Sequence, residues 1–236
     1  MFNILTLNKI SKVGLDKLDP AKYTCSDSVE APDAILVRSA SMHEMTLSPA
    51  TFAIGRAGAG VNNIPVADFG AQGVAVFNTP GANANAVKEL VLCSLFLASR
   101  KVASAVDWCK TLKGEGDAVG KLVEKGKSAF AGPEILGKTL GVIGLGAIGT
   151  LVAEGAKALG MDIVGYNPKL SEERIADLTS KGIKLMSSLD ELYAASDYIT
   201  LHLPLNDSTR GMINGEAIAK MKDGVRILNF ARGELV

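Results

Sequence analysis

The chain has 236 residues, 47% hydrophobic and 21% charged, which suits one large or two small globular domains. Its 25 basic and 25 acidic residues balance, which argues against a nucleic-acid or membrane partner recognised by bulk charge. The three cysteines form no CxxC pair and no cluster with histidine, so we expect free thiols and no metal site. Free thiols, and a first segment that resembles a strand rather than a signal peptide, favour a cytoplasmic protein.

Short β-type runs alternate with helical patterns, which predicts βα units and mainly parallel sheets. The expected strands are residues 2–7, 34–38, 52–55 and 75–78, followed by 139–143, 162–166, 198–203 and 226–229. Between these sets, apolar residues spaced three and four apart predict a long helix over about 85–112. Such a helix would join two domains, residues 1–97 and 98–236, although one helix within a single sheet is the alternative. The stretches 113–120 and 125–132, rich in glycine and lysine, are expected to be surface loops.

A glycine-rich turn follows the apolar strand expected at 139–143. Gly144, Gly146 and Gly149 have the Gly-X-Gly-X-X-Gly spacing, and a helix and a second strand come next within about 30 residues. The first glycine permits a tight turn, the second lets backbone approach a pyrophosphate, and the third lets helix and strand pack closely. This order predicts a dinucleotide site, with a glycine turn that binds no ligand as the alternative.

The residue after the second strand bears on which dinucleotide binds. An acidic side chain there would normally accept a hydrogen bond from the ribose 2′-hydroxyl, but this chain has Asn167, with Lys169 two residues on. Asparagine can accept the same bond and does not repel a 2′-phosphate. We therefore expect NAD as the cofactor and leave NADP open.

Several further segments carry a family resemblance that covers essentially the whole chain. They are Val37-Arg38-Ser39-Ala40, Gly55 to Ile64, Asn78 to Asn83, the segment from Gly137 through the glycine turn, His202-Leu203-Pro204-Leu205 with Thr209, and Asn229 to Gly233. In these segments the chain resembles the D-2-hydroxyacid dehydrogenases, and among them most closely the members that oxidise 3-phospho-D-glycerate in serine synthesis.

The resemblance implies an α/β fold of two doubly wound, Rossmann-like parallel-sheet domains. The first would be a flavodoxin-like, substrate-binding domain, and the second an NAD-binding domain that is incomplete at its C-terminus. A homodimer is also implied, as is a small anionic 2-hydroxy or 2-oxo acid substrate that carries a phosphate.

The resemblance also assigns site residues. Arg232 matches the catalytic arginine, which would hold the substrate carboxylate and polarise the 2-oxo group. The residues implied for substrate binding are Arg38, Ser39, Arg56, Gly58, Ala59 and Gly60. Those implied for cofactor binding are Ala59, Gly144, Gly146, Ala147, Ile148, Gly149, Asn167, His202, Leu203, Pro204, Thr209, Phe230, Ala231 and Arg232.

The sequence ends before the Glu–His pair that supplies the general acid in this family. The two histidines present, His43 and His202, match neither position. We therefore expect the chain to be part of a longer enzyme. Two alternatives stay open: another D-2-hydroxyacid dehydrogenase such as a glyoxylate or hydroxypyruvate reductase, and a non-enzymatic NAD(H) sensor similar to corepressors.

Overall fold

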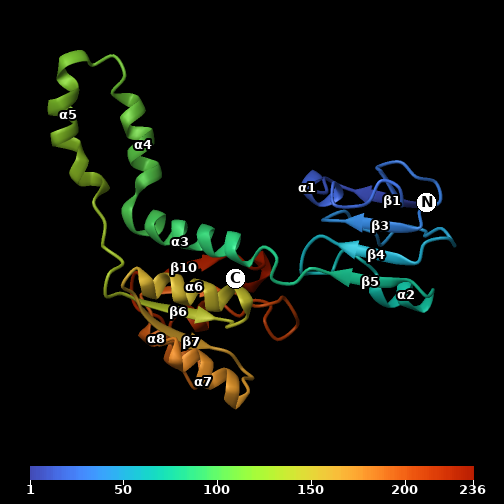
Figure 1. Cartoon of the computed structure of the whole chain (residues 1–236). Helices are drawn as coiled ribbons and strands as arrows, with labels where there is room; N and C mark the ends of the chain where they lie inside the picture. The colour runs from blue at the N-terminus through green and yellow to red at the C-terminus, as the bar shows by residue number, and fades with distance from the viewer. The chain divides into compact units, whose positions relative to one another are not determined.

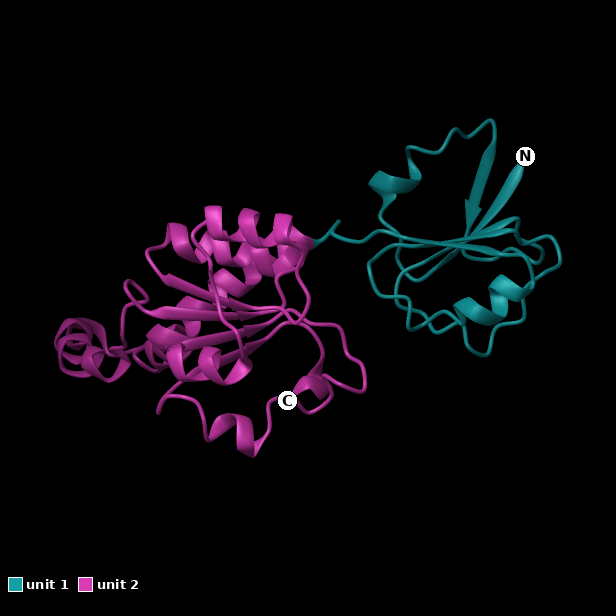
Figure 2. Ribbon diagram, turned by 90° about the horizontal axis from the view of Figure 1, so that it is seen from below, with its two compact units in different colours: residues 1–83 teal, residues 84–236 magenta.

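The computed structural model describes residues 1–236, which form two compact units, Met1–Asn83 and Ala84–Val236 (Figure 2). Each unit contains its own five-stranded parallel sheet, so the expected α/β fold with two doubly wound sheets is confirmed. The expected boundary at 97/98 falls inside helix α3 (Ala84–Arg100), which belongs entirely to the second unit. No helix is both long and apolar enough to cross a membrane.

The sheet of the first unit has the strand order β2-β1-β3-β4-β5, the flavodoxin-like order of doubly wound folds. Ile35, Val37 and Ile54 are fully buried in its core. The sequence did not predict β2, because Tyr23-Thr24-Cys25-Ser26 lacks an apolar run and is only half-buried. The elements are β1 (Phe2–Leu7), α1 (Lys12–Leu15), β2 (Tyr23–Ser26), β3 (Ala34–Val37), β4 (Ala53–Arg56), α2 (Val66–Ala71) and β5 (Ala75–Asn78).

The sheet of the second unit has the order β10-β9-β6-β7-β8, with helices on both of its faces (Figure 2). Its strands are β6 (Thr139–Ile143), β7 (Asp162–Tyr166), β8 (Lys184–Leu185), β9 (Tyr198–Leu201) and β10 (Arg226–Asn229). Its helices after α3 are α4 (Val102–Thr111), η1 (Gly116–Ala118), α5 (Val119–Gly126), η2 (Lys127–Phe130), α6 (Ala147–Ala158), α7 (Glu172–Ser180), α8 (Leu189–Ala195), α9 (Gly215–Ile218) and η3 (Gly233–Leu235).

The predicted long helix over 85–112 is broken in two at Lys101, whose φ of 41° is left-handed. The prediction that residues 113–120 and 125–132 are loops is wrong in part. These stretches contain η1, the start and end of α5, and η2. Helices α4 and α5 form an arm (Figure 1). The ring centroid of Trp108 in α4 lies 5.1 Å from that of Phe130 in η2. That contact links residues far apart in sequence, which local composition does not reveal.

Helices α3 and α6 pack on the second sheet and bury a continuous core. Val91 and Leu95 of α3 are fully buried together with Leu140, Val142 and Val152. A second cluster lies around Leu192 of α8 and includes Leu235 near the chain end. These clusters fix β6 and its neighbours, whose carboxyl ends carry the candidate cofactor residues.

Candidate cofactor and substrate sites

Four parallel strands of the second unit place their carboxyl ends at one edge of the sheet. In register, Ile143 of β6 lies beside Tyr166 of β7 and Leu201 of β9, and Leu201 lies beside Asn229 of β10. The glycine turn, Asn167, His202 and Phe230-Ala231-Arg232 each follow one of these strand ends. The chain order reverses between β6 and β9, and ligands of doubly wound sheets bind at such a switch point.

The three glycines of the turn differ in what surrounds them. Gly144 has a φ of 95°, and a Cβ there would lie 2.6 Å from the carbonyl oxygen of His202. A Cβ at Gly149 would lie 1.9 Å from the carbonyl oxygen of Gly144, so β6 and α6 approach closely only with glycine. At Gly146 the φ is −79° and a Cβ would meet nothing within 4 Å. Nothing in the protein therefore requires glycine at 146, whereas a ligand in contact with this backbone would.

Helix α6 begins directly after Gly146 with no side-chain cap. Its first amides have no intrahelical partner, and the helix dipole favours an anion at this end. Ala147 is exposed and Ile148 is half-buried, as a surface that binds a ligand requires. These residues fit the pyrophosphate of a dinucleotide.

Asn167, expected at the cofactor ribose, makes two hydrogen bonds within the protein. Its Oδ1 accepts from the Leu145 amide at 3.3 Å, and its Nδ2 donates to the Lys169 carbonyl oxygen at 2.9 Å. The side chain therefore shapes the glycine turn from the end of β7. Lys169 itself is exposed.

His202 is half-buried at the end of β9. Its Nε2 lies 3.0 Å from the Thr200 hydroxyl, and burial lowers its pKa to about 4. The ring is therefore neutral at physiological pH, which suits packing better than proton donation to a substrate. Thr200 was not among the predicted residues, because its role depends on the ring beside it.

The segment after His202 closes into a loop. Thr209 donates from its hydroxyl to the Pro204 carbonyl oxygen at 2.8 Å and accepts from the Asn206 amide at 2.9 Å. Leu203 packs towards the turn, with its Cδ2 3.0 Å from the Cβ position of Gly144. Thr209 thus fixes the loop that carries Pro204.

Arg232 is exposed at the end of the turn that follows β10. Asn229 shapes this turn, since its Nδ2 donates to the Arg232 carbonyl oxygen at 2.7 Å and its Oδ1 accepts from the Ala231 amide at 3.1 Å. Leu235 is fully buried, and its carbonyl oxygen accepts from the Ile213 amide at 2.9 Å. Sequence reasoning missed Leu235, although an apolar residue after an Arg-Gly turn is a signal for such an anchor.

In the first unit, the predicted substrate residues follow two adjacent strands. Val37 and Arg56 are register partners at the ends of β3 and β4, which brings Arg38 and Ser39 near the segment 56–60. The Ser39 amide donates to Oδ1 of Asn8 at 3.0 Å. Asn8 was not predicted, and its left-handed φ of 66° marks it as the residue that shapes this edge.

Arg56 lies across the backbone of its own turn. Its Nη1 donates to the Ala57 carbonyl oxygen at 3.1 Å, and a Cβ at Gly58 would collide with the guanidinium. The Nε of Arg56 is buried without a partner. A cavity of about 180 Å³ adjoins Arg56, Asn78 and Thr79. A buried donor without a partner is costly to stability.

A glycine turn between parallel strand and helix, at the switch point of a doubly wound sheet, defines the class of dinucleotide-binding proteins. Comparison with known families agrees. The sequence model of the D-isomer specific 2-hydroxyacid dehydrogenase NAD-binding domain matches residues 92–236, and the chain belongs to this family.

Individual relatives are similar over most of the chain. A D-3-phosphoglycerate dehydrogenase of Mycobacterium tuberculosis is 42% identical over 212 residues, which are 89% of this chain and 37% of that protein. A hydroxypyruvate reductase of Thermotoga maritima is 43% identical over 204 residues, 85% of this chain and 61% of that protein. The chain thus spans 37% and 61% of the length of these two relatives, under two thirds of each.

Solved structures have the same fold. The NAD⁺-bound 3-phosphoglycerate dehydrogenase of Entamoeba histolytica is 26% identical with a TM-score of 0.73, covering 100% of this chain and 73% of that one. A glyoxylate reductase from Paecilomyes thermophila is 28% identical with a TM-score of 0.77, covering 100% and 75%.

Proposed function

We propose that the chain is the cofactor- and substrate-binding part of an NAD-dependent dehydrogenase that oxidises 3-phospho-D-glycerate to 3-phosphohydroxypyruvate, or reduces the latter. The nicotinamide, when bound, would supply the hydride acceptor for the oxidation and the hydride donor for the reduction. The observation that carries the proposal is Gly146, where a Cβ would meet nothing in the protein, at the start of α6, which has no side-chain cap. Membership of the family supports it.

Within this proposal, residues of the second unit bind the cofactor. The amides at the start of α6 bind the pyrophosphate, and His202, Leu203 and Pro204 line the groove beside it. Phe230 and Ala231 flank the nicotinamide. Arg232 is the catalytic residue, because an exposed guanidinium can bind the substrate carboxylate in bidentate fashion and polarise its 2-oxo group.

Residues of the first unit bind the substrate. The Gly58 amide donates to the Arg56 carbonyl oxygen at 2.8 Å and shapes the turn, the amides of Ala59 and Gly60 are those proposed to bind a carboxylate, and Ser39 lies beside the neighbouring strand end. Arg56, half-buried at the end of β4, and exposed Arg38 are the cations proposed for the phosphate. The D-3-phosphoglycerate dehydrogenase relatives support this choice of substrate.

A second candidate is a reductase of unphosphorylated hydroxypyruvate. The Thermotoga maritima relative favours it, since its identity of 43% is similar to the 41–42% of the mycobacterial relatives. The two candidates differ in one substrate group, the phosphate, and share the cofactor site.

The role of Gly146 is tested by adding one methyl group. Gly146→Ala should raise the Kd for NADH about tenfold or more, because the Cβ occupies the surface that the pyrophosphate approaches; tenfold corresponds to about 1.4 kcal/mol. The measurement is a fluorescence titration with NADH, paired with urea unfolding.

Gly120→Ala is the matched control, since Gly120 lies in α5 and a Cβ there also meets nothing within 4 Å. Gly120→Ala should unfold slightly later than the wild type, because alanine is favoured inside a helix, and Gly146→Ala slightly earlier, because glycine is preferred to alanine at the N-cap of α6. If the wild type binds no NADH, or Gly146→Ala binds it as tightly, the cofactor site is not where we propose.

A further inference from the structure

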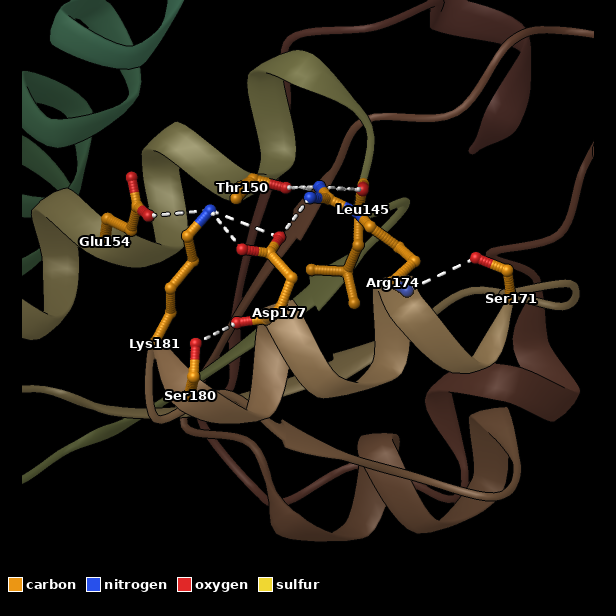
Figure 3. A network of polar contacts seen from close by, with 8 residues as sticks. All are labelled: Leu145, Thr150, Glu154, Ser171, Arg174, Asp177, Ser180 and Lys181. Carbon is orange, nitrogen blue, oxygen red and sulfur yellow. Dashed lines mark hydrogen bonds and ion pairs between the residues drawn. The ribbon is translucent and has the colours of Figure 1, made fainter.

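A side chain outside the glycine motif contacts the turn from α7 (Figure 3). Helix α7 begins at the cap Ser171, whose hydroxyl accepts from the Arg174 amide at 3.2 Å. The Arg174 side chain reaches the turn, where its Nη2 donates to the Leu145 carbonyl oxygen at 3.2 Å and to the Thr150 hydroxyl at 2.6 Å. One guanidinium therefore bonds to both the turn and α6.

Leu145 is the residue between the first two glycines, and both of its backbone polar groups are held by side chains. Its amide donates to Asn167, and its carbonyl oxygen accepts from Arg174 and, at 3.3 Å, from the Thr150 hydroxyl. Leu145 itself is buried. These bonds fix the peptide units that lead into Gly146 and the start of α6.

The guanidinium is in turn oriented by an ion-pair network (Figure 3). Its Nη1 bonds to Asp177, one turn along α7. Asp177 also pairs with Lys181 at 3.1 Å, and Lys181 pairs with Glu154 of α6 at 3.3 Å. Asp177 carries the opposite charge and neutralises the arginine locally. The effect of Arg174 on the turn therefore comes from its directional hydrogen bonds more than from its net charge.

We propose that Arg174 is a positioning residue for the cofactor: it holds the Leu145 peptide so that the amides beside Gly146 face the pyrophosphate. The proposal rests on the proposed cofactor site. A preformed turn avoids the ordering cost that a loose one would pay on binding. Loss of Arg174 should therefore weaken ligands that carry a pyrophosphate and spare those that do not.

The test compares three ligands on the full chain: NADH, ADP-ribose and adenosine. Arg174→Met keeps an apolar stem and removes the guanidinium, and it should raise the Kd for NADH and ADP-ribose about tenfold, from the loss of charged hydrogen bonds. The Kd for adenosine, which lacks a pyrophosphate, should stay the same. Titrations are made at a temperature well below the unfolding midpoint of each variant.

Lys220→Met is the matched control, since Lys220 pairs with Asp190 in the same unit at 2.8 Å and lies outside the network that orients Arg174. It should leave all three Kd values unchanged. If Arg174→Met does not fold, Thr150→Val decides: it removes the hydroxyl shared by Arg174 and Leu145, and should raise the Kd for NADH and ADP-ribose about threefold.

The outcomes separate the two claims. Wild-type protein that binds no NADH contradicts the proposed function. Wild-type protein that binds NADH, with Arg174→Met or its substitute Thr150→Val weakening all three ligands equally or none of them, overturns the positioning role alone.

Discussion

The three glycines of the turn illustrate how different demands select the same residue. Gly144 and Gly149 are required by the protein, because a Cβ at either would lie within 3 Å of backbone oxygen. Gly146 is required by neither conformation nor packing. Two glycines of the motif therefore support the fold and one is available to a ligand. Substitution of Gly144 or Gly149 should lower stability, whereas substitution of Gly146 should mainly weaken binding.

His202 should make stability depend on pH. Burial holds its pKa at about 4, below the 6.5 of a free histidine, so the unfolded chain binds the proton first as pH falls. Stability from this residue is full above pH 6.5 and decreases as pH falls towards 4. Between pH 7.5 and pH 5 the free energy of unfolding of the wild type, measured with urea, should fall by about 2 kcal/mol more than that of His202→Gln. Equal losses would mean that the ring protonates freely in the folded protein.

At the scale of elements, the second unit begins with helix α3. Its residues Val91 and Leu95 are fully buried against that unit, and the Ser99 hydroxyl lies 2.7 Å from the Tyr198 hydroxyl of β9. The helix is thus a layer of the second unit, although its apolar stripe by itself equally suits a connection between domains.

Two fragments test this assignment. Residues 84–236 should unfold cooperatively in urea and bind NADH. Residues 98–236 lack the part of α3 that carries Val91 and Leu95, and should be less stable by about 3–6 kcal/mol, at 1.5–3 kcal/mol for each fully buried side chain. Similar unfolding of the two fragments would instead support a boundary at 97/98.

At the scale of the whole molecule, each unit presents its candidate residues at the carboxyl ends of adjacent parallel strands. The first unit contains the residues proposed to bind the substrate, and the second contains those proposed to bind the cofactor, apart from Ala59. The phosphate of the substrate is the group that distinguishes the two proposed reactions.

Calorimetric titration with 3-phosphoglycerate and D-glycerate compares ligands that differ by that phosphate. The phosphorylated acid should bind about tenfold more tightly, and Arg56→Met should reduce the difference, because it removes one of the two cations proposed for the phosphate. Arg100→Met, which removes an exposed arginine of the second unit, is the control. Equal binding of both acids by the wild type would favour the unphosphorylated substrate.

The sequence by itself determined the eight main strands to within two residues at each end, the glycine turn and the family, because strand patterns and motif spacings are local. Only the tertiary structure revealed β2, β8, the break at Lys101 and helix α5. It also placed α3 in the second unit and turned Asn167 and Arg174 towards Leu145. These features depend on partners distant in the sequence, whose contacts no local pattern records.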